Sequence, residues 1–340
     1  MTTPQEKLKI LVVFNYFKPL AAPDIDSISE AAVENEALAI RQALINVGHI
    51  AELYPINDLM SAIEYIKVFQ PDVIFNLCEG FRNTSTHEMN VAGLWELMEI
   101  PYTGNTPLTL GLAQNKVLTK RILHTHGLLT PEYEVYDGVP EQCELEYPLI
   151  AKPSHEDGSL GITQDSIIHD FEDLQKTVCD LLEKYDQPIL VEKFIAGREF
   201  NIAVLGNDEP QVLPPSEISF KRIKKYYPIT SYEAKWLNDH PLYKQTPPIC
   251  PAKIPVGLHQ RLSDLGLRVY RLLMGRDYGR IDVRMDENEN LFILEYNPNP
   301  DISPDSGFIR ALKAAGMDYE YFADFLVHEA LTRKTHVHNT

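Results

Sequence analysis

The stretch that decides the fold is a pair of short runs on either side of a turn: Gly279-Arg280-Ile281-Asp282-Val283-Arg284, then Asp286-Glu287-Asn288-Glu289-Asn290, then Leu291-Phe292-Ile293-Leu294-Glu295-Tyr296-Asn297. Two runs that alternate polar with apolar residues, separated by five turn-forming residues, predict a β-hairpin. Because side chains on a strand have a period of two, Asp282 shares a face with the flanking arginines, and Glu295 shares a face with Asn297. Folding about Asn288 would bring Asp282 roughly opposite the Glu295 end.

The polar residues of this hairpin predict a magnesium site. Two carboxylates and an amide oxygen that converge on one spot are too costly to bury without a partner. Mg²⁺ suits them better than Zn²⁺, because no Cys or His lies among them. Mg²⁺ held by few protein oxygens usually also binds phosphate oxygens, so the rest of the chain should hold a nucleotide. The alternative is a solvated hairpin with an acidic face.

The composition is that of a soluble globular protein with room for two or three domains. The chain has 340 residues, of which 44% are hydrophobic and 24% are charged. A formal net charge of -18 argues against nucleic acid or an anionic membrane as the main partner. Four cysteines without C-x-x-C spacing favour reduced thiols in the cytoplasm. No apolar run approaches the ~18 residues that span a bilayer, so we expect a cytosolic protein.

Residues 8–104 alternate strand-like and helix-like segments, which predicts a parallel sheet covered by helices. The expected strands are 8–14, 51–54 and 72–77, and the expected helices are about 29–47 and 58–69. Ligands of such sheets bind at the carboxyl ends of the strands. Glu79 and Glu88 follow the third strand and are therefore candidate substrate contacts. For each of them the alternative is a helix cap or a surface charge.

The middle of the chain carries candidate nucleotide contacts. A strand over about 147–154 contains Lys152 near its end and is followed by a loop with Ser159, a combination that can bind phosphate oxygens. A plain turn is the alternative. After a helix over about 171–185, two strands within 188–205 carry Glu192 and Glu199, near which an adenine amino group and ribose hydroxyls could bind. Solvated charge at a strand end is the alternative for both.

The C-terminal part adds a candidate lid. Residues 226–248 are expected to form a long polar loop, and loops of this length in compact domains are often lids. The remaining expected elements are an amphipathic helix over about 256–273, the hairpin, a helix that starts at Ser306, and a helix over about 319–331.

The order of these parts resembles the ATP-grasp fold, and within it the D-alanine–D-alanine ligase family of carboxylate-amine ligases. The resemblance covers nearly the whole chain from Asp72 onward. It implies an N-terminal parallel α/β domain over 1–105, a central α+β subdomain over 106–205 and a C-terminal α+β subdomain over 206–340. ATP would lie between the two α+β subdomains.

The resemblance also implies roles for individual residues. The hairpin set Asp282, Glu295 and Asn297 would bind two Mg²⁺ ions, for which Mn²⁺ could substitute. The implied ATP contacts are the phosphate ligands Lys116, Lys152 and Ser159, the adenine contacts Glu192, Lys193 and Ile195, the ribose ligand Glu199, and the γ-phosphate ligand Lys235 within Tyr232-Glu233-Ala234-Lys235.

The family's reaction has two steps. A substrate carboxylate attacks the γ-phosphate of ATP, and the amine of a second substrate then displaces phosphate from the acyl phosphate. The clustered lysines and metal ions would stabilise the first step, and Arg280 would stabilise the tetrahedral oxyanion of the second. Ser306 resembles the residue that holds the carboxylate of the second substrate. A homodimer is expected from the resemblance alone.

Three departures from the family concern the amino-acid substrates. The N-terminal Gly-Gly loop and its glutamate are missing: Asn15-Tyr16-Phe17-Lys18-Pro19 stands there, and the candidates to replace the glutamate are Glu30, Glu34 and Glu36. Glu79-Gly80 stands where the family has His-Gly, and Asp301 stands where a glycine N–H would help the oxyanion. D-Alanyl-D-alanine is the first candidate product. The alternatives are a ligase for other amino acids, peptides or an amino-acid-like metabolite, and an ATP-binding protein without ligase turnover.

Overall fold

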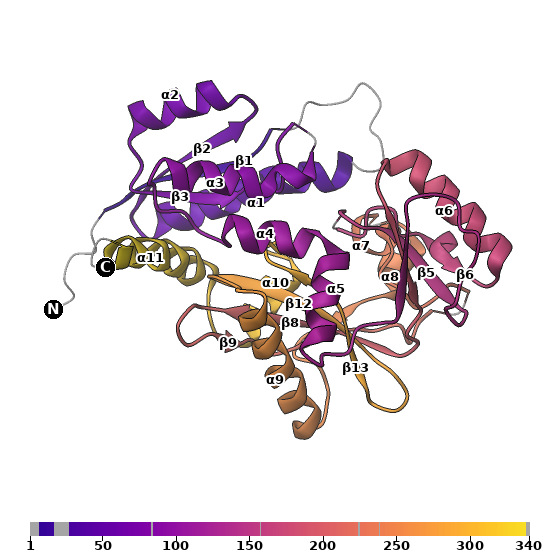
Figure 1. The fold of residues 1–340 in the computed structure, drawn as a ribbon. Coiled ribbons are helices and arrows are strands. Elements are labelled where there is room, and N and C mark those ends of the chain that lie inside the picture. Colours follow the sequence, from indigo (N-terminus) through magenta and orange to yellow (C-terminus); the bar gives the residue numbers. More distant parts are fainter. Residues whose placement is uncertain are drawn as a thin grey trace.

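The computed structural model describes residues 7–16, 27–82, 84–156, 158–223, 225–237 and 239–337, except for the side chains of residues 27–32 and 334–337. Phe17, Lys18, Pro19 and the Glu30 side chain, which the sequence analysis singles out, lie outside this description. The described chain forms three sheets, which follow one another along the sequence (Figure 1).

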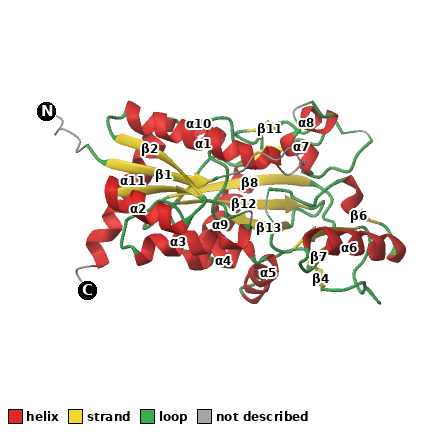
Figure 2. Cartoon of the chain, turned by 90° about the horizontal axis from the view of Figure 1, so that it is seen from above, coloured by secondary structure: helices red, strands yellow, loops and turns green. Residues whose placement is uncertain are grey.

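The N-terminal sheet is parallel, as the βαβ pattern predicts, with strand order β2-β1-β3. Its elements are β1 (Lys9–Asn15), α1 (Ser27–Asn46), β2 (Ile50–Ile56), α2 (Leu59–Phe69), β3 (Val73–Leu77) and α3 (Glu88–Leu97). Alternate residues of β1 are buried on opposite faces of the sheet. Ile10 and Val12 pack with α1, whereas Leu11 and Val13 pack with α2 and α3. The sheet is therefore covered on both faces, as Figure 2 shows.

The central sheet is small and antiparallel, with strand order β4-β7-β5-β6. Its elements are β4 (Tyr133–Tyr136), β5 (Leu149–Pro153), β6 (Ile167–Ile168), α6 (Phe171–Tyr185) and β7 (Ile189–Lys193). One face packs on α6, where Leu174 and Val178 meet Ala151 and Val191. The helix has the bounds that the sequence predicts, and Asp170 caps it by accepting a hydrogen bond from the Asp173 N–H at 2.9 Å.

The C-terminal sheet is antiparallel, with strand order β11-β10-β8-β12-β13 and with β9 paired to β8. Its strands are β8 (Arg198–Leu205), β9 (Gln211–Val212), β10 (Ser216–Ile218), β11 (Pro248–Ile249), β12 (Tyr278–Met285) and β13 (Leu291–Asn297). One face packs on α9 (Val256–Leu272) through residues such as Phe200 and Ile281. The predicted boundary between the central and C-terminal subdomains lies at residue 206, but β8 ends before that residue and pairs with β12 of the hairpin. The division of the chain into three domains remains a prediction.

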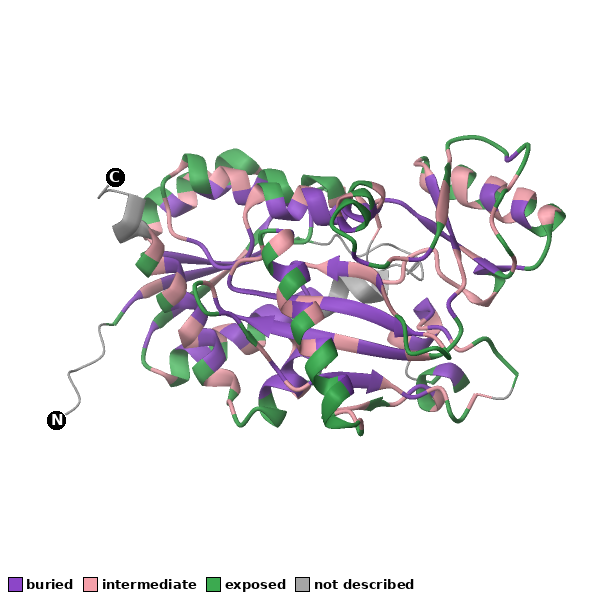
Figure 3. Cartoon of the chain, turned by 60° about the horizontal axis from the view of Figure 1, so that its bottom comes forward, coloured by how far each residue is buried: buried purple, intermediate pink, exposed green. Residues whose placement is uncertain are grey.

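The other face of this sheet changes character along its strands. Near one end, Leu205 and Tyr278 are buried in the core that also contains α10 (Gly307–Ala314) and α11 (Tyr319–Val337). Farther along, the same face carries Asn201, Asp282 and Arg284, which lie beneath the central sheet. Figure 3 shows the strands as the most buried part of the molecule, with exposed residues gathered on the outer helices. A cleft between two sheets is therefore lined by charged side chains.

The segment expected to be a long polar loop over 226–248 contains two short helices. These are α7 (Tyr232–Trp236) and α8 (Pro241–Gln245). The other short elements are η1 (Ser85–His87), α4 (Pro107–Gln114), α5 (Lys116–Thr125) and η2 (Gln164–Ser166). Within the described part of the chain, no helix is both long and apolar enough to cross a membrane.

Candidate functional site

The predicted hairpin is present and places its polar residues in register. Asp282 lies directly opposite Glu295, and Arg280 lies opposite Asn297. On its other edge β12 pairs with β8, so that Asn201 lies opposite Asp282. Residues directly opposite each other in antiparallel strands share a face. The prediction that Asp282 meets the Glu295 end is confirmed.

A β-bulge in β13 explains why Glu295 lies in the cleft. The register shifts between Asp282 and Val283, so that Val283 faces Ile293 and Leu294 is the extra residue. Strict alternation would place Ile293 and Glu295 on the same face. With the bulge, Ile293 is fully buried in the core against α9, while Leu294 and Glu295 both line the cleft.

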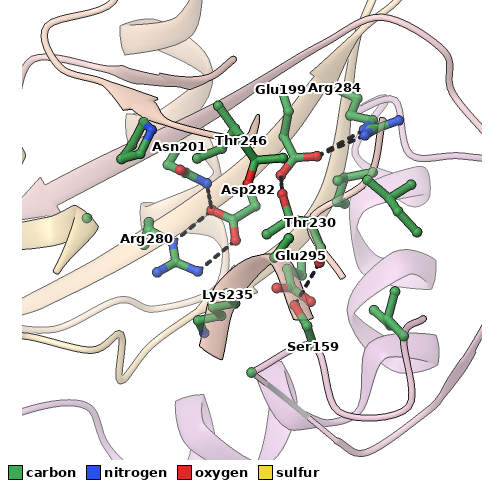
Figure 4. A pocket seen from close by; sticks show the side chains of 18 of the residues that line it. Ser159, Glu199, Asn201, Thr230, Lys235, Thr246, Arg280, Asp282, Arg284 and Glu295 are labelled. Carbon is green, nitrogen blue, oxygen red and sulfur yellow. Dashed lines mark hydrogen bonds and ion pairs between the residues drawn. The ribbon is translucent and has the colours of Figure 1, made fainter. Parts of the chain in front are cut away.

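The cleft is a cavity of about 900 Å³ between the central and C-terminal sheets (Figure 4). It is lined by most of the residues predicted to bind ATP, which are Lys152, Ser159, Glu192, Lys193, Ile195, Glu199 and Lys235. It is also lined by the predicted metal ligands Asp282 and Glu295 and by the predicted catalytic or substrate residues Arg280, Asp301 and Ser306. Lys116 lies beside it, with its Nζ 4.0 Å from the Glu295 carboxylate. Asn297, Glu79 and Glu88 line a second cavity of about 210 Å³, which shares Lys235 and Asp301 with the first.

The carboxylates of the hairpin are surrounded by cations. Arg280 donates two hydrogen bonds of 2.8 Å to Asp282, and Asn201 donates a third of 2.6 Å. Burial raises the pKa of Glu295, but nearby cations, chiefly Lys116 and Lys152, outweigh it and hold that pKa below its ordinary value. Glu295 is therefore ionised at neutral pH.

The hairpin set is chemically suited to Mg²⁺. Asp282 and Glu295 supply carboxylate oxygens, and the Asn297 side-chain oxygen lies on the same face and accepts a hydrogen bond from the Asn299 N–H at 3.0 Å. No three His, Cys, Asp or Glu side chains among the described residues gather as a metal site. That result is consistent with an expected set of only two carboxylates and one amide.

A buried ion network surrounds Glu192 in the cleft. Glu192 binds Lys152 through one carboxylate oxygen at 2.6 Å and Lys120 through the other. Lys120 also donates to the Thr130 hydroxyl at 2.6 Å and to the Leu294 carbonyl at 3.3 Å. Burial lowers the pKa of Lys120 to about 8. Sequence analysis missed Lys120, although its spacing of four from Lys116 on one helix was an available signal.

A second network holds Glu199. Arg284 donates two hydrogen bonds of 3.1 Å to it and another of 2.7 Å to the Ile195 carbonyl. The Thr230 hydroxyl donates to the other carboxylate oxygen at 2.7 Å. The Arg284–Glu199 pair thus ties the strand edge near Ile195 to β12 and to the segment that precedes α7.

The two loops over the cleft contact each other. The Ser159 hydroxyl donates to the Thr230 carbonyl at 3.0 Å, and the Trp236 indole donates to the Gly158 carbonyl at 2.9 Å. The Lys235 ammonium lies 4.8 Å from the centre of the Trp236 ring. Burial, reinforced by Arg280, lowers the pKa of Lys235.

Helix α10 begins at the mouth of the cleft. The Ser306 hydroxyl caps it by accepting a hydrogen bond from the Ile309 N–H at 3.3 Å, so the predicted helix start is confirmed. Arg310, one turn farther along, also lines the cleft, and its Nε is buried without a hydrogen-bond partner among the described residues. No role was predicted for Arg310 from the sequence.

Comparisons with known proteins agree with this geometry. The family model described as D-ala D-ala ligase C-terminus matches residues 125–328. The chain is 36% identical over 250 residues to an uncharacterized protein of Sinorhizobium fredii, covering 73% of this chain and 71% of that one. It is 38% identical over 252 residues to a D-alanine--D-alanine ligase of Desulforudis audaxviator, covering 72% and 77% of the two chains.

A solved structure shares the fold. The D-alanine--D-alanine ligase of Bacillus anthracis complexed with ATP superposes with a TM-score of 0.77 at 19% identity, covering 97% of this chain and 99% of that one. The fold is therefore the ATP-grasp fold, with a parallel N-terminal sheet and two antiparallel sheets around the cleft. The chain belongs to the D-alanine–D-alanine ligase family of ATP-grasp enzymes, which are ATP-dependent carboxylate-amine ligases.

Proposed function

We propose that this ligase joins the carboxylate of one amino acid to the amine of another through an acyl phosphate. The observation that carries the proposal is the Asp282–Glu295 pair, which lines the large cleft among cations. ATP would occupy the large cleft, with adenine near Glu192, Lys193 and Ile195.

In the first step the substrate carboxylate attacks the γ-phosphorus, and ADP leaves. Lys116, Lys152 and Lys235 would stabilise the negative charge that spreads over the transferring phosphoryl oxygens. Ser159 would contribute a phosphate contact from its loop, and Glu199 would bind the ribose hydroxyls. Contacts between this loop and the α7 segment would exclude water, which otherwise hydrolyses an acyl phosphate.

Two Mg²⁺ ions, or Mn²⁺ in their place, would be held by Asp282, Glu295 and Asn297. When bound, they would neutralise phosphate charge in the first step. The fit rests on the donor set, which is all oxygen, lies on one face and includes a Glu295 that is ionised without metal.

In the second step the amine of the acceptor attacks the acyl carbon, and phosphate leaves. Arg280 would stabilise the tetrahedral oxyanion, because its guanidinium is fixed in the cleft by two bonds to Asp282. Ser306, at the N-terminus of α10, would hold the acceptor carboxylate. Asp301 lies beside both cavities and would contact a substrate.

D-Alanine is the reference substrate, because curated relatives are named D-alanine--D-alanine ligase. The altered residues Glu79 and Asp301 favour the alternative of another amino acid or an amino-acid-like metabolite. We place the enzyme in the cytoplasm as a homodimer that acts on small molecules, and not on nucleic acid or membranes. The family membership, and the net charge of -18, support this placement.

The test is phosphate release from ATP and Mg²⁺ across pairs of D- and L-amino acids, with mass detection of products. We expect release that depends on amino acids and a loss of at least 10³-fold in kcat for Glu295→Gln, because the metal pair is broken. Glu287→Gln, an exposed residue of the same hairpin, is the matched control and should retain activity. Full activity of Glu295→Gln at saturating Mg²⁺ would refute the metal assignment.

A further inference from the structure

Four described residues line both cavities and therefore mark the boundary between them. These are Gly158, Lys235, Trp236 and Asp301. Burial raises the pKa of Glu295, and Lys235 is one of the cations that lower it, so this lysine lies near the predicted metal site. An ammonium group at the boundary can meet a phosphoryl group in the large cleft, and the side chains around the ammonium decide where it points.

The Trp236 side chain holds the Lys235 ammonium without neutralising it. The Lys235 Nζ lies 4.8 Å from the centre of the indole ring, a distance at which a cation is attracted to the face of the ring. By contrast, Lys152 is paired with the Glu192 carboxylate at 2.6 Å. An aromatic ring carries no net charge, so the Lys235 ammonium keeps its positive charge and its N–H donors for phosphate oxygens.

The Trp236 ring is itself fixed from two sides. Its indole N–H donates to the Gly158 carbonyl at 2.9 Å, and a Cβ atom built on Gly158 would lie 3.9 Å from the Trp236 Cζ2 and 4.0 Å from the Lys235 Nζ. The Tyr232 ring, one turn earlier on α7, lies 6.4 Å from the Trp236 ring, and the Tyr232 N–H donates to the Ile162 carbonyl at 2.9 Å. The loop after β5 and the segment with α7 thus meet around this one side chain.

We propose that Trp236 is a positioning residue for phosphoryl transfer, which directs the Lys235 ammonium toward the γ-phosphate of ATP and fixes it relative to the loop after β5. This inference rests on the ligase function proposed above, in which Lys235 binds the γ-phosphate. Trp236 makes no bond to the substrates in this role. It acts through Lys235, whose ammonium would otherwise move freely on its flexible four-carbon stem.

The test uses nucleotides alone, so it needs no amino-acid substrate. Calorimetric titration of the full chain with Mg²⁺ would compare ADP with adenylyl imidodiphosphate, an ATP analogue whose γ-phosphoryl group is not hydrolysed. The ratio of the two dissociation constants measures the contact with the γ-phosphate. Lys235→Met should lower the preference for the analogue at least about tenfold, because a charge-assisted contact is lost. Trp236→Leu should lower it at least about fivefold, and Trp236→Phe, which keeps a ring face, less than about threefold.

A double-mutant cycle shows whether Trp236 acts through the lysine. In a chain that already carries Lys235→Met, Trp236→Leu should change the ratio less than about twofold, because the ammonium that the ring holds is gone. The control is Tyr226→Leu, which removes a 37% exposed ring that lines neither cavity, and it should leave the ratio within about twofold. Urea denaturation of each variant checks that it is folded.

Four results would overturn the inference. They are an unchanged ratio in Lys235→Met, an unchanged ratio in Trp236→Leu, equal losses in the Leu and Phe variants, and a Trp236→Leu effect of the same size with and without Lys235. The last of these would indicate a purely structural role. Phosphate release in the amino-acid panel would still support the ligase proposal in each case. The expected ratios without phosphate release in any amino-acid pairing would support the inference and count against the ligase proposal.

Discussion

At the scale of single residues, the cleft contains buried ion pairs. Glu192 is 1% exposed, and each of its oxygens meets a lysine. Burial alone would raise the pKa of Glu192, but Lys120 and Lys152 hold it below its ordinary value. Lys152 would turn toward a bound phosphate, whereas Lys120 is anchored by Thr130 and by the Leu294 carbonyl. Lys120 is therefore the residue that keeps Glu192 charged and in place.

Replacing Lys120 with methionine should destabilise the protein by about 3 kcal/mol, because removing one partner leaves a buried carboxylate incompletely compensated. Urea denaturation at neutral pH measures this change. The matched control is Arg261→Met, since Arg261 pairs with Glu289 at 3.4 Å with both side chains largely exposed. That substitution should cost about 0.5 kcal/mol or less. Equal effects of the two substitutions would contradict the role given to Lys120.

At the scale of elements, the sequence predicts the hairpin well and its bulge not at all. The alternation of polar and apolar residues determines both strands, the turn and the meeting of Asp282 with Glu295, because each depends on local periodicity. The bulge at Leu294 depends on which neighbours cover each face, and the core against α9 lies far away in sequence. Ile293 and Glu295 are two residues apart, so they would lie on the same face of a regular strand. Only tertiary packing places their side chains on opposite faces.

The contrast between local periodicity and long-range packing also explains which other predictions from the sequence agree with the structure. The parallel sheet and helix α6 follow from strong periodic patterns. Helices α7 and α8 have five residues each, too few to give a periodic signal, and were therefore predicted as loop. Arg310 was missed because a single basic residue on a helix gives no sign of what it faces, and Lys120 was missed although Lys116 lies one turn before it on the same helix. Family resemblance supplied the predicted ATP contacts.

Deleting Leu294 tests the bulge. Without the extra residue, Ile293 and Glu295 become consecutive, and regular alternation keeps them on opposite faces, as the bulge does. We therefore expect the deletion to keep Ile293 opposite Val283 and Glu295 opposite Asp282, and to retain phosphate release within about tenfold. Leu294→Ala, which shortens the same side chain and keeps the bulge, is the control and should also lose less than about tenfold. A fall of at least about 10²-fold in the deletion variant alone would show that the bulge itself, and not only the placement of the two side chains on opposite faces, positions Glu295.

At the scale of the whole molecule, two of the three sheets share a core. Ile10 of the N-terminal sheet and Leu205 of the C-terminal sheet belong to one cluster of buried residues. Asp277, which is fully buried, joins the same two parts by accepting hydrogen bonds from the Gly104 N–H at 2.7 Å and from Arg333. The central sheet has its own core of seven buried residues, none of which belongs to the other clusters described. The molecule is therefore a large block with a smaller sheet set over its charged face.

This division predicts how protection from hydrogen exchange responds to nucleotide. A small separate core opens locally at lower cost than a large one, so amides of β5 and β7 should exchange faster than those of β1 and β12 in the free protein.

A non-hydrolysable ATP analogue with Mg²⁺ would bind residues on both sides of the cleft: Lys152 and Glu192 of the central sheet, and Asp282 and Glu295 of the C-terminal sheet. A ligand that binds only when the central sheet is folded stabilises this sheet against local opening. Hydrogen exchange in β5 and β7 should therefore slow at least about tenfold, while exchange in β1 changes little. The Glu295→Gln variant with the same ligand is the control and should show a smaller effect, since it binds metal less well. Equal protection of all four strands in the free protein, or an equal response of β1 and β5 to nucleotide, would mean that the central sheet opens only with the rest of the molecule.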